Sequence, residues 1–284
     1  MRPIREIRTS AITQTVSQLC QEANFSLGDD VLQALREAKK EEESPLGSQV
    51  IDQLLKNAEL CQRERLPLCQ DCGSAIVFLE MGQDVHISGG GLHEAVQEGV
   101  HQGYKQGYLR KSMVSQPFSA RLNTKDNTPA IIHADIVPGD RLKITVMPKG
   151  GGSENVSRLF MLTPAQGRQG IIDAVVQAVD EAGSSPCPPI IVGVGIGGSA
   201  EKAMMMAKKC LLRKVNETNP DPEVAELEKE LLRRINALGI GPQGFGGRIT
   251  ALAVHIETFP THMTSLPVTI SFQCNAARHK EAVL

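Results

Sequence analysis

The stretch Leu66-Pro-Leu-Cys-Gln-Asp-Cys-Gly-Ser-Ala-Ile-Val-Phe-Leu-Glu-Met81 marks a change in the character of the chain. Before it, residues 9–65 carry apolar side chains at helical spacing, interrupted by short breaks. Its second half, Ala75–Met81, is a continuous apolar run with the length of a strand. The sequence therefore predicts a helical N-terminal region, residues 1–65, packed on a mixed-sheet body, residues 66–284.

The body alternates predicted strands and helices without an internal repeat or a clear linker. We expect one domain of mixed α/β class that spans residues 1–284. Strands at Ala130–Ile136 and Leu142–Met147 are expected to form a hairpin through Val137-Pro-Gly-Asp140. The other elements are predicted as strands at 189–194, 249–256 and 266–272 and as helices at 92–104, 170–182, 200–213 and towards Leu231 and Ile235.

Composition excludes several classes of protein. The 284 residues include 41% apolar and 22% charged side chains, as in an ordinary globular protein. A formal net charge of −2 gives no electrostatic footprint for nucleic acid or an anionic membrane. No run approaches the ~18 apolar residues of a membrane span, and the N-terminus lacks a signal-peptide core. We therefore expect a cytoplasmic protein.

Seven cysteines, an odd number in a chain of this length, favour metal or reactive-thiol roles over a disulfide framework. Cys69, Cys187 and Cys274 have proline, glycine or polar neighbours, which place them on loops or segment ends. Three thiolates do not complete a four-ligand site. An iron–sulfur cluster held by three cysteines would leave one iron open for substrate. The alternative is three unrelated thiols in a reducing compartment.

Two shorter patterns suggest other classes of function. Cys69-x-x-Cys72 on its own is typical of a redox pair or half of a zinc site, although no second pair follows it. Gly193-Val-Gly-Ile-Gly-Gly198 matches the dinucleotide fingerprint, but the region about 20 residues later looks like a loop and not a second strand. A tight turn from strand to helix explains these glycines better.

The segment Lys149-Gly-Gly-Gly-Ser-Glu-Asn155 carries three successive glycines. Backbone amides in such a segment can point at one anion, and a small carboxylate suits it better than a nucleoside triphosphate, because the Gly-Lys-Ser/Thr ending is absent. A flexible turn after the preceding strand is the alternative. Glu154 and Asn155 are expected to support the glycines.

A series of motifs in order resembles the α subunit, or N-terminal domain, of the class I iron–sulfur fumarate hydratase and L-tartrate dehydratase family. The resemblance covers about residues 5–280. The motifs are Pro67-x-Cys-Gln-Asp-x-Gly73, Tyr108-Leu-Arg110, Asp126-Asn-Thr-Pro129, Lys149–Asn155, Cys187-Pro-Pro189, Gly193–Gly198, Gly239-Ile-Gly-Pro-Gln-Gly244, Thr261-His262, Leu266-Pro-Val268 and Cys274-x-Ala-Ala-Arg278.

The resemblance implies a 4Fe–4S cluster held by Cys69, Cys187 and Cys274. A Lewis-acidic iron would weaken the C–O bond of a 2-hydroxy acid, so that water can leave without a strong acid. The resemblance also assigns roles to residues around the cluster. These are proton transfer by Asp71, substrate orientation by Gln70, a carboxylate clamp at Arg110, amide contacts to the other carboxylate at Gly151 and Gly152, and a bond to substrate from His262.

Several residues have simpler interpretations. Without the resemblance, Arg110 could be a solvated helix end and His262 could cap a turn. His133 and His255 lie in apolar strands and are expected to be core residues with satisfied hydrogen bonds. The remaining thiols Cys20, Cys61 and Cys210 are expected to pack in the core.

One position departs from the family pattern. The family usually has threonine where this chain has Cys72. This second thiol could be a bystander, a protective disulfide partner on oxidation or an alternative ligand in place of Cys69. We favour a bystander.

The resemblance implies a partner and a substrate class. The chain ends ten residues after Cys274, so a separate β subunit is expected to complete the site in a heterodimer or heterotetramer. The substrate is expected to be a small dicarboxylate. Dehydration of (S)-malate to fumarate is the first reading, and dehydration of L-tartrate to oxaloacetate is the alternative.

Overall fold

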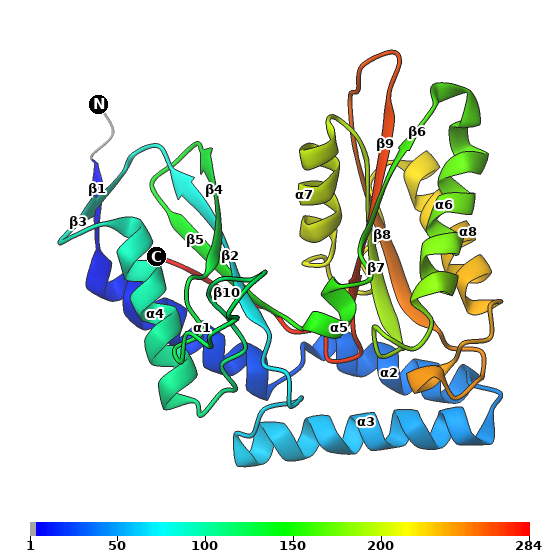
Figure 1. The fold of residues 1–284 in the computed structure, drawn as a ribbon, viewed down its shortest axis with the longest axis horizontal. Coiled ribbons are helices and arrows are strands. Elements are labelled where there is room, and N and C mark those ends of the chain that lie inside the picture. Colours follow the sequence, from blue (N-terminus) through cyan, green and yellow to red (C-terminus); the bar gives the residue numbers. More distant parts are fainter. Residues whose placement is uncertain (1–3) are drawn as a thin grey trace. The chain divides into compact units, whose positions relative to one another are not determined.

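The computed structural model describes residues 4–284, which form two compact units (Figure 1). Unit 1 contains the described residues up to Leu27, residues Ala58–Gly151 and residues Arg278–Leu284. Unit 2 contains Gly28–Asn57 and Gly152–Ala277. The expectation of a single domain stays a prediction, and the residues of the predicted helical region are divided between the two units.

Unit 1 is built on a four-stranded mixed sheet with the strand order β10-β5-β2-β4. Helices α1 and α4 pack together, and their apolar faces cover the buried residues of β2 and β5. A short parallel pair, β1 and β3, completes the unit. The bounds are β1 Arg5–Arg8, α1 Thr9–Phe25, β2 Ser74–Gly82, β3 Val85–Ser88, α4 Leu92–Gln106, β4 Ile131–Val137, β5 Leu142–Lys149 and β10 Lys280–Val283.

The predicted hairpin between β4 and β5 is wrong. Strand β2 lies between them, parallel to β4 and antiparallel to β5. Both strands exist within a residue or two of their predicted bounds, and Gly139 has the positive φ expected of a turn. The apolar run of β2 is buried over most of its length, so it stabilises the sheet as a central strand.

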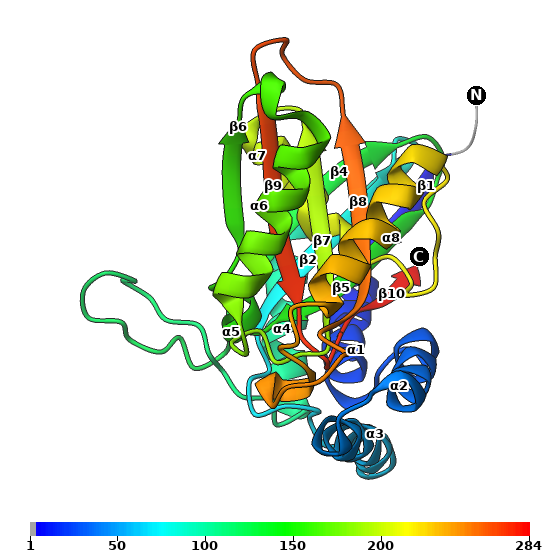
Figure 2. The same cartoon turned by 90° about the vertical axis from the view of Figure 1, so that its right-hand side faces the viewer.

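Unit 2 contains a second four-stranded mixed sheet with the order β6-β9-β7-β8. Helices α6 and α8 cover one face of this sheet and α7 covers the other (Figure 2). The bounds are α2 Asp29–Glu41, β6 Arg158–Leu162, α6 Gly167–Ala182, β7 Ile190–Gly197, α7 Ala200–Cys210, α8 Pro222–Asn236, β8 Ala251–Phe259 and β9 Leu266–Gln273. Helices α3, Pro45–Glu64, and α5, Gly151–Glu154, contain residues of both units.

The glycine fingerprint in unit 2 serves the packing of α7. Gly193 and Gly195 lie inside the buried strand β7, and a Cβ on either would come within about 2.2 Å of a carbonyl oxygen of α7. Gly197 and Gly198, which follow, have positive φ and form the turn into the helix. These four glycines are therefore explained by close packing and a tight turn.

The mixed α/β class predicted from the sequence is confirmed. Most predicted helices and strands are present, whereas the short strands β1, β3, β6 and β10 were not predicted. No helix within residues 4–284 has the length and apolar content to cross a membrane.

Candidate functional site

Burial separates the seven cysteines into two groups. Cys69 and Cys274 are half-buried and Cys187 is exposed, whereas the other four are buried. Burial raises the pKa of Cys20 and of Cys210 to about 12, and it also raises the pKa of Cys61 and Cys72. Only the three predicted cluster ligands are therefore accessible thiols, and the prediction that Cys20, Cys61 and Cys210 pack in the core is confirmed.

Buried hydrogen bonds hold the segment Cys69–Gly73, here called the cysteine loop, in unit 1. The hydroxyl of Tyr104 donates to the carbonyls of Cys72 and Gly73 at 2.7 and 3.1 Å. The amide of Asn127, fully buried, donates to the Gly73 carbonyl at 3.0 Å. Gly73 has φ +71, and a Cβ there would meet the backbone of Lys149 at 2.6 Å. Only glycine fits this position without a rearrangement.

Asp71 lies in the cysteine loop with its carboxylate held by two backbone amides. Gly73 donates to Oδ1 at 2.9 Å and Gly151 donates to Oδ2 at 2.7 Å. The glycine segment predicted to bind an anion therefore directs one of its amides at the carboxylate of the chain itself. The same amide is the one that the sequence assigned to a substrate carboxylate, so Asp71 and a substrate would compete for it.

Arg278 is a buried cation that the list of site residues predicted from sequence omits. Its side chain is 1% exposed, and its Nη1 donates to the Asp71 carbonyl at 2.7 Å and to Asn24 Oδ1 at 3.1 Å. Within residues 4–284 its Nε has no hydrogen-bond partner and its guanidinium has no carboxylate partner. A Cβ on Gly150 would lie 3.4 Å from Nη2 and 3.3 Å from Asp71 Oδ2. The last residue of the Cys274-x-Ala-Ala-Arg motif was the available signal.

Gln70, Cys72 and Arg110 surround the same loop. Gln70 is exposed and its Oε1 accepts from Cys69 Sγ at 3.2 Å. Cys72 is buried, and its sulfur accepts the backbone amide of Arg110 at 3.2 Å. The side chain of Arg110 is exposed. The structure therefore places the backbone of Arg110 against the cysteine loop, and Cys72 is a packed thiol that joins the two segments.

Unit 2 brings Cys187 and Cys274 into one neighbourhood, here called the cysteine end of unit 2. Cys187 precedes β7 and Cys274 follows β9, and Ile191 of β7 pairs with Gln273 of β9. Asn275 donates to the Cys187 carbonyl through its backbone amide at 3.1 Å and through its side chain at 2.9 Å. Two predicted ligands that are far apart in sequence therefore lie on adjacent segments.

Gly152 also belongs to the cysteine end of unit 2. A Cβ at this position would lie 2.8 Å from the carbonyl oxygen of Ser185, two residues before Cys187. Nearby, Glu154 pairs with Lys208 of α7, so this carboxylate supports the segment as predicted. The position of Gly152 leaves no room for a side chain.

His262 lies in the connection between β8 and β9, at the opposite end of β9 from Cys274. Its ring is exposed, and Nδ1 lies 2.9 Å from the hydroxyl of Thr264. It lines a cavity of 510 Å³ with an apolar base that includes Ile196 and Leu266. The structure therefore separates His262 from the other predicted site residues of unit 2.

The other histidines have structural surroundings. His133 is half-buried and stacks on Phe78 with ring centroids 5.3 Å apart. His255 is buried as predicted, but the prediction that its hydrogen bonds are satisfied is wrong, because neither ring nitrogen has a partner within residues 4–284. Burial, together with the charge of Arg213, lowers the pKa of His255 to about 4. This histidine is therefore neutral at pH 7.

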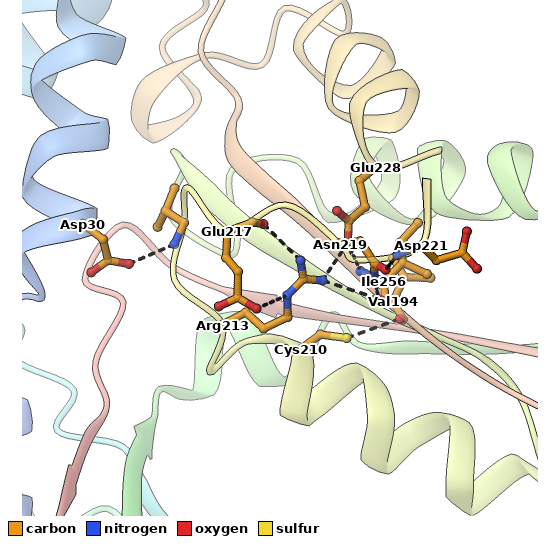
Figure 3. Close-up of polar contacts among 10 residues, drawn as sticks. Asp30, Val194, Cys210, Arg213, Glu217, Asn219, Asp221, Glu228 and Ile256 are labelled. Atoms are coloured by element: carbon orange, nitrogen blue, oxygen red, sulfur yellow. Dashed lines mark hydrogen bonds and ion pairs between the residues drawn. The ribbon is translucent and has the colours of Figure 1, made fainter. Parts of the chain in front are cut away.

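A buried ion pair explains the charge beside His255 (Figure 3). Arg213 Nη1 lies 2.7 Å from Glu228 Oε1, which also accepts the backbone amide of Ile256 at 2.7 Å. Arg213 Nη2 donates to the Glu217 carbonyl at 3.0 Å, and Asn219 donates to the Ile256 carbonyl at 2.9 Å. The network fixes the segment between α7 and α8 and is structural.

The donor atoms of the two units fit an iron–sulfur cluster. Cysteine thiolates are the usual ligands of such clusters, and the accessible thiols number three. The backbone amide of Asp71 points at the sulfur of Cys69, at 3.4 Å, and hydrogen bonds to ligand sulfur tune a cluster. Neither unit, over residues 4–284, gathers three or more His, Cys, Asp or Glu side chains by itself around a metal position. A cluster bound by all three thiols would take one ligand from unit 1 and two from unit 2.

Comparisons with known proteins agree with these assignments. The family model described as "Fumarate hydratase (Fumerase)" matches residues 13–283. A protein of Methanocaldococcus jannaschii named "Putative L(+)-tartrate dehydratase subunit alpha" is 43% identical over 272 residues, which cover 94% of this chain and 95% of that protein. The "L(+)-tartrate dehydratase subunit alpha" of Escherichia coli UTI89 is 31% identical over 270 residues, 94% of this chain and 88% of the relative. The E. coli K12 protein of the same name is 30% identical over the same shares of each chain.

The family match spans almost the whole chain, and these relatives align along most of their own length. The family resemblance that the sequence motifs suggested is confirmed. The chain belongs to the fumarate hydratase family and is a hydro-lyase.

Proposed function

We propose that the chain is the α subunit of an L(+)-tartrate dehydratase that uses a 4Fe–4S cluster held by Cys69, Cys187 and Cys274. The observation that supports the cluster is that these three thiols are accessible and the other four are buried. The names of the relatives support tartrate over malate, which reverses the order of preference drawn from the sequence. Fumarate hydratase is the second candidate and is supported by the name of the matching family.

Dehydration of tartrate breaks a C–O bond at one carbon and a C–H bond at the next. Hydroxide leaves with the bonding electrons of the C–O bond, a base takes the proton, and the enol formed becomes oxaloacetate. When bound, the cluster would supply a Lewis-acidic iron for the departing hydroxyl. Asp71 is our candidate for proton transfer in this chain, since its carboxylate is half-buried and held by the amides of Gly73 and Gly151.

The carboxylates of the substrate require cationic and amide donors. Arg110, exposed beside the cysteine loop, is proposed to clamp one carboxylate. Gly151 and Gly152 are proposed to bind the other through backbone amides, and Gln70 is proposed to orient the substrate. Arg278 is proposed to position Asp71, because it binds the carbonyl of that residue. His262 is proposed to bond the substrate hydroxyl or carboxylate.

A separate β subunit is proposed to complete the site, in a heterodimer or heterotetramer. The printed names of the relatives, each an α subunit, support this partner. A reducing cytoplasm is the proposed location, since none of the seven cysteines, all within residues 4–284, forms a disulfide.

The test is to purify the chain anaerobically, reconstitute it with iron and sulfide, and measure both per chain. We expect about four irons and four sulfides. Cys69→Ser, Cys187→Ser and Cys274→Ser should each lose the cluster, whereas Cys210→Ser, at a buried thiol of α7, should retain it. Retention of metal without Cys187 and Cys274 would favour a zinc or thiol module at Cys69 and Cys72 instead.

The substrate is tested with the β subunit present. Formation of oxaloacetate from L-tartrate should exceed formation of fumarate from malate at equal substrate concentration. Faster turnover of malate would assign the chain to the second candidate.

A further inference from the structure

The position of His262 raises a problem of reach within unit 2. Strand β9 separates His262 from Cys274, and its eight residues span roughly 26 Å at about 3.3 Å per residue. The sheet pairing fixes both ends of this strand, because Leu266 pairs with Leu162 and Gln273 pairs with Ile191. His262 therefore cannot reach the cysteine end of its own unit 2 while the sheet is intact.

Strand β6 is an edge strand of the same sheet. It pairs with β9 on one side, and the sheet order places no described strand on its other side. Leu159 and Met161 point to the same face and are 39% and 58% exposed. An edge strand with exposed apolar side chains is a template for pairing with another strand. Met263, next to His262, is also apolar and 86% exposed.

We propose that a second copy of this chain pairs its β6 with this β6, antiparallel and centred on Phe160. In this register Leu159 of each copy faces Met161 of the other, and Arg158 faces Leu162. Each exposed apolar side chain of the strand therefore gains an apolar neighbour, and no like charges meet. The sequence of β6 is thus self-complementary, as a two-fold interface requires.

The same pairing solves the problem of reach. The register of β6 with β9 aligns Phe160 with Val268. A two-fold axis at this level maps the position six residues before Val268, which is His262, onto the position six residues after it, which is Cys274. His262 of the second copy would lie level with Cys274 along the strand direction. The lateral separation is three strand spacings, about 14 Å, which the connection between β8 and β9 and a bound dicarboxylate can bridge.

The inference rests on the proposed function, because it assigns His262 to that site, and it adds that the residue acts in trans. The active assembly would then contain two copies of this chain, each of which supplies His262 to the cysteine end of the other. The cavity beside His262 would open towards the partner site.

The interface is tested first by mass. Met161→Lys places a charge on the edge of β6, and Ile136→Lys is the matched control, because Ile136 is 72% exposed on β4, the edge strand of the sheet in unit 1. In the complex with the β subunit, Met161→Lys should halve the mass measured by sedimentation and retain the iron content. Ile136→Lys should leave both unchanged. An unchanged mass in Met161→Lys, or a wild-type complex with one copy of this chain, would overturn the proposal.

The role in trans is tested by complementation. His262→Ala and Cys274→Ser are expressed alone and together, each with the β subunit, and purified anaerobically. Each variant alone should have below 1% of wild-type activity, and His262→Ala should retain its cluster. Co-expressed chains should recover about a quarter of wild-type activity, because half of the random pairs are mixed and each mixed pair contains one complete site.

The outcomes separate this inference from the proposed function. If His262 acts within its own chain, the mixed pairs remain inactive although the wild type is active. If His262→Ala alone is active, the histidine has no part in the reaction and the inference also fails. If the wild-type complex lacks a cluster or turns over neither tartrate nor malate, the proposed function fails, and the mass measurement still decides whether β6 pairs.

Discussion

The cysteine loop of unit 1 and the cysteine end of unit 2 are held in place by different means. The loop is fixed by the fully buried side chains of Tyr104 and Asn127 and by Arg278, which is 1% exposed. The end of unit 2 is joined by Asn275, a half-buried residue, through two hydrogen bonds to one carbonyl. Hydrogen bonds buried away from water are stronger and tolerate less change.

The difference teaches which half of the site is preorganised. Cys69 and Asp71 lie on a loop whose backbone carbonyls are bound by buried donors, so their positions are set before any ligand arrives. Cys187 is exposed and its φ of +56 is uncommon for a residue other than glycine. The cysteine end of unit 2 can therefore adjust when a cluster binds. The predictions below test this contrast, from the largest expected effect to the smallest.

Arg278→Met should weaken the preorganised half most. The change keeps much of the apolar volume, but it leaves the carbonyl of Asp71 and the amide oxygen of Asn24 without their donor. Buried acceptors that lose a charged donor cost about 3 kcal/mol together, and the free energy of unfolding of unit 1 should fall by about that amount. Urea titration followed by hydrogen exchange of residues 69–73 measures it.

Exposed Arg141 provides the control for that variant, and Arg141→Met should leave the stability unchanged. Equal exchange of residues 69–73 in Arg278→Met and the wild type would mean that the loop does not depend on this cation.

Acid should weaken unit 2 through His255. Burial lowers the pKa of this histidine to about 4, whereas the unfolded chain binds the proton near pH 6.5. The unfolded state therefore holds more protons between these values, and the stability contributed by neutral His255 is lost as the pH falls from 6.5 towards 4. Between pH 7 and pH 5 the loss should be about 2 kcal/mol. Hydrogen exchange of β8 at the two pH values gives the measurement.

His255→Leu removes the titration and serves as the comparison. Its stability in unit 2 should depend less on pH over the same range. A pH dependence as steep as that of the wild type would assign the acid sensitivity to other groups.

Asn275→Ala should have the smallest effect. It removes the side-chain bond to the Cys187 carbonyl and keeps the bond from the backbone amide. A half-exposed hydrogen bond contributes about 1 kcal/mol, so the stability should fall by no more than that. Cys187 should react faster with a maleimide, because its segment is held by one bond less. Asn216→Ala, at an exposed position of unit 2, should change neither value.

The local parts of the fold could be predicted from the sequence. Helix α4 and strands β7 and β9 lie within two or three residues of their expected bounds, because their apolar patterns are long and regular. Strand β6 was missed, since five residues after a short helix carry little periodic signal. The hairpin of β4 and β5 was wrong because a turn signal does not exclude the insertion of a strand from elsewhere in the chain.

The candidate site divides in the same way. The sequence by itself determined which residue types are available, that is, three thiols in loop settings, a carboxylate beside one of them and a segment of glycines. Motifs of this kind are local, so chain order suffices to find them. The family that they suggested is the one that the chain belongs to.

The tertiary structure decided which of these residues meet. It joined Cys187 to the segment of Cys274, directed the Gly151 amide at Asp71, buried Arg278 beneath the cysteine loop and placed His262 at the far end of β9. Each of these contacts or separations depends on residues that are far apart in the chain or on the length of a paired strand. The physical reason is that burial and long-range hydrogen bonding are properties of the packed chain, and no local pattern of residues encodes them.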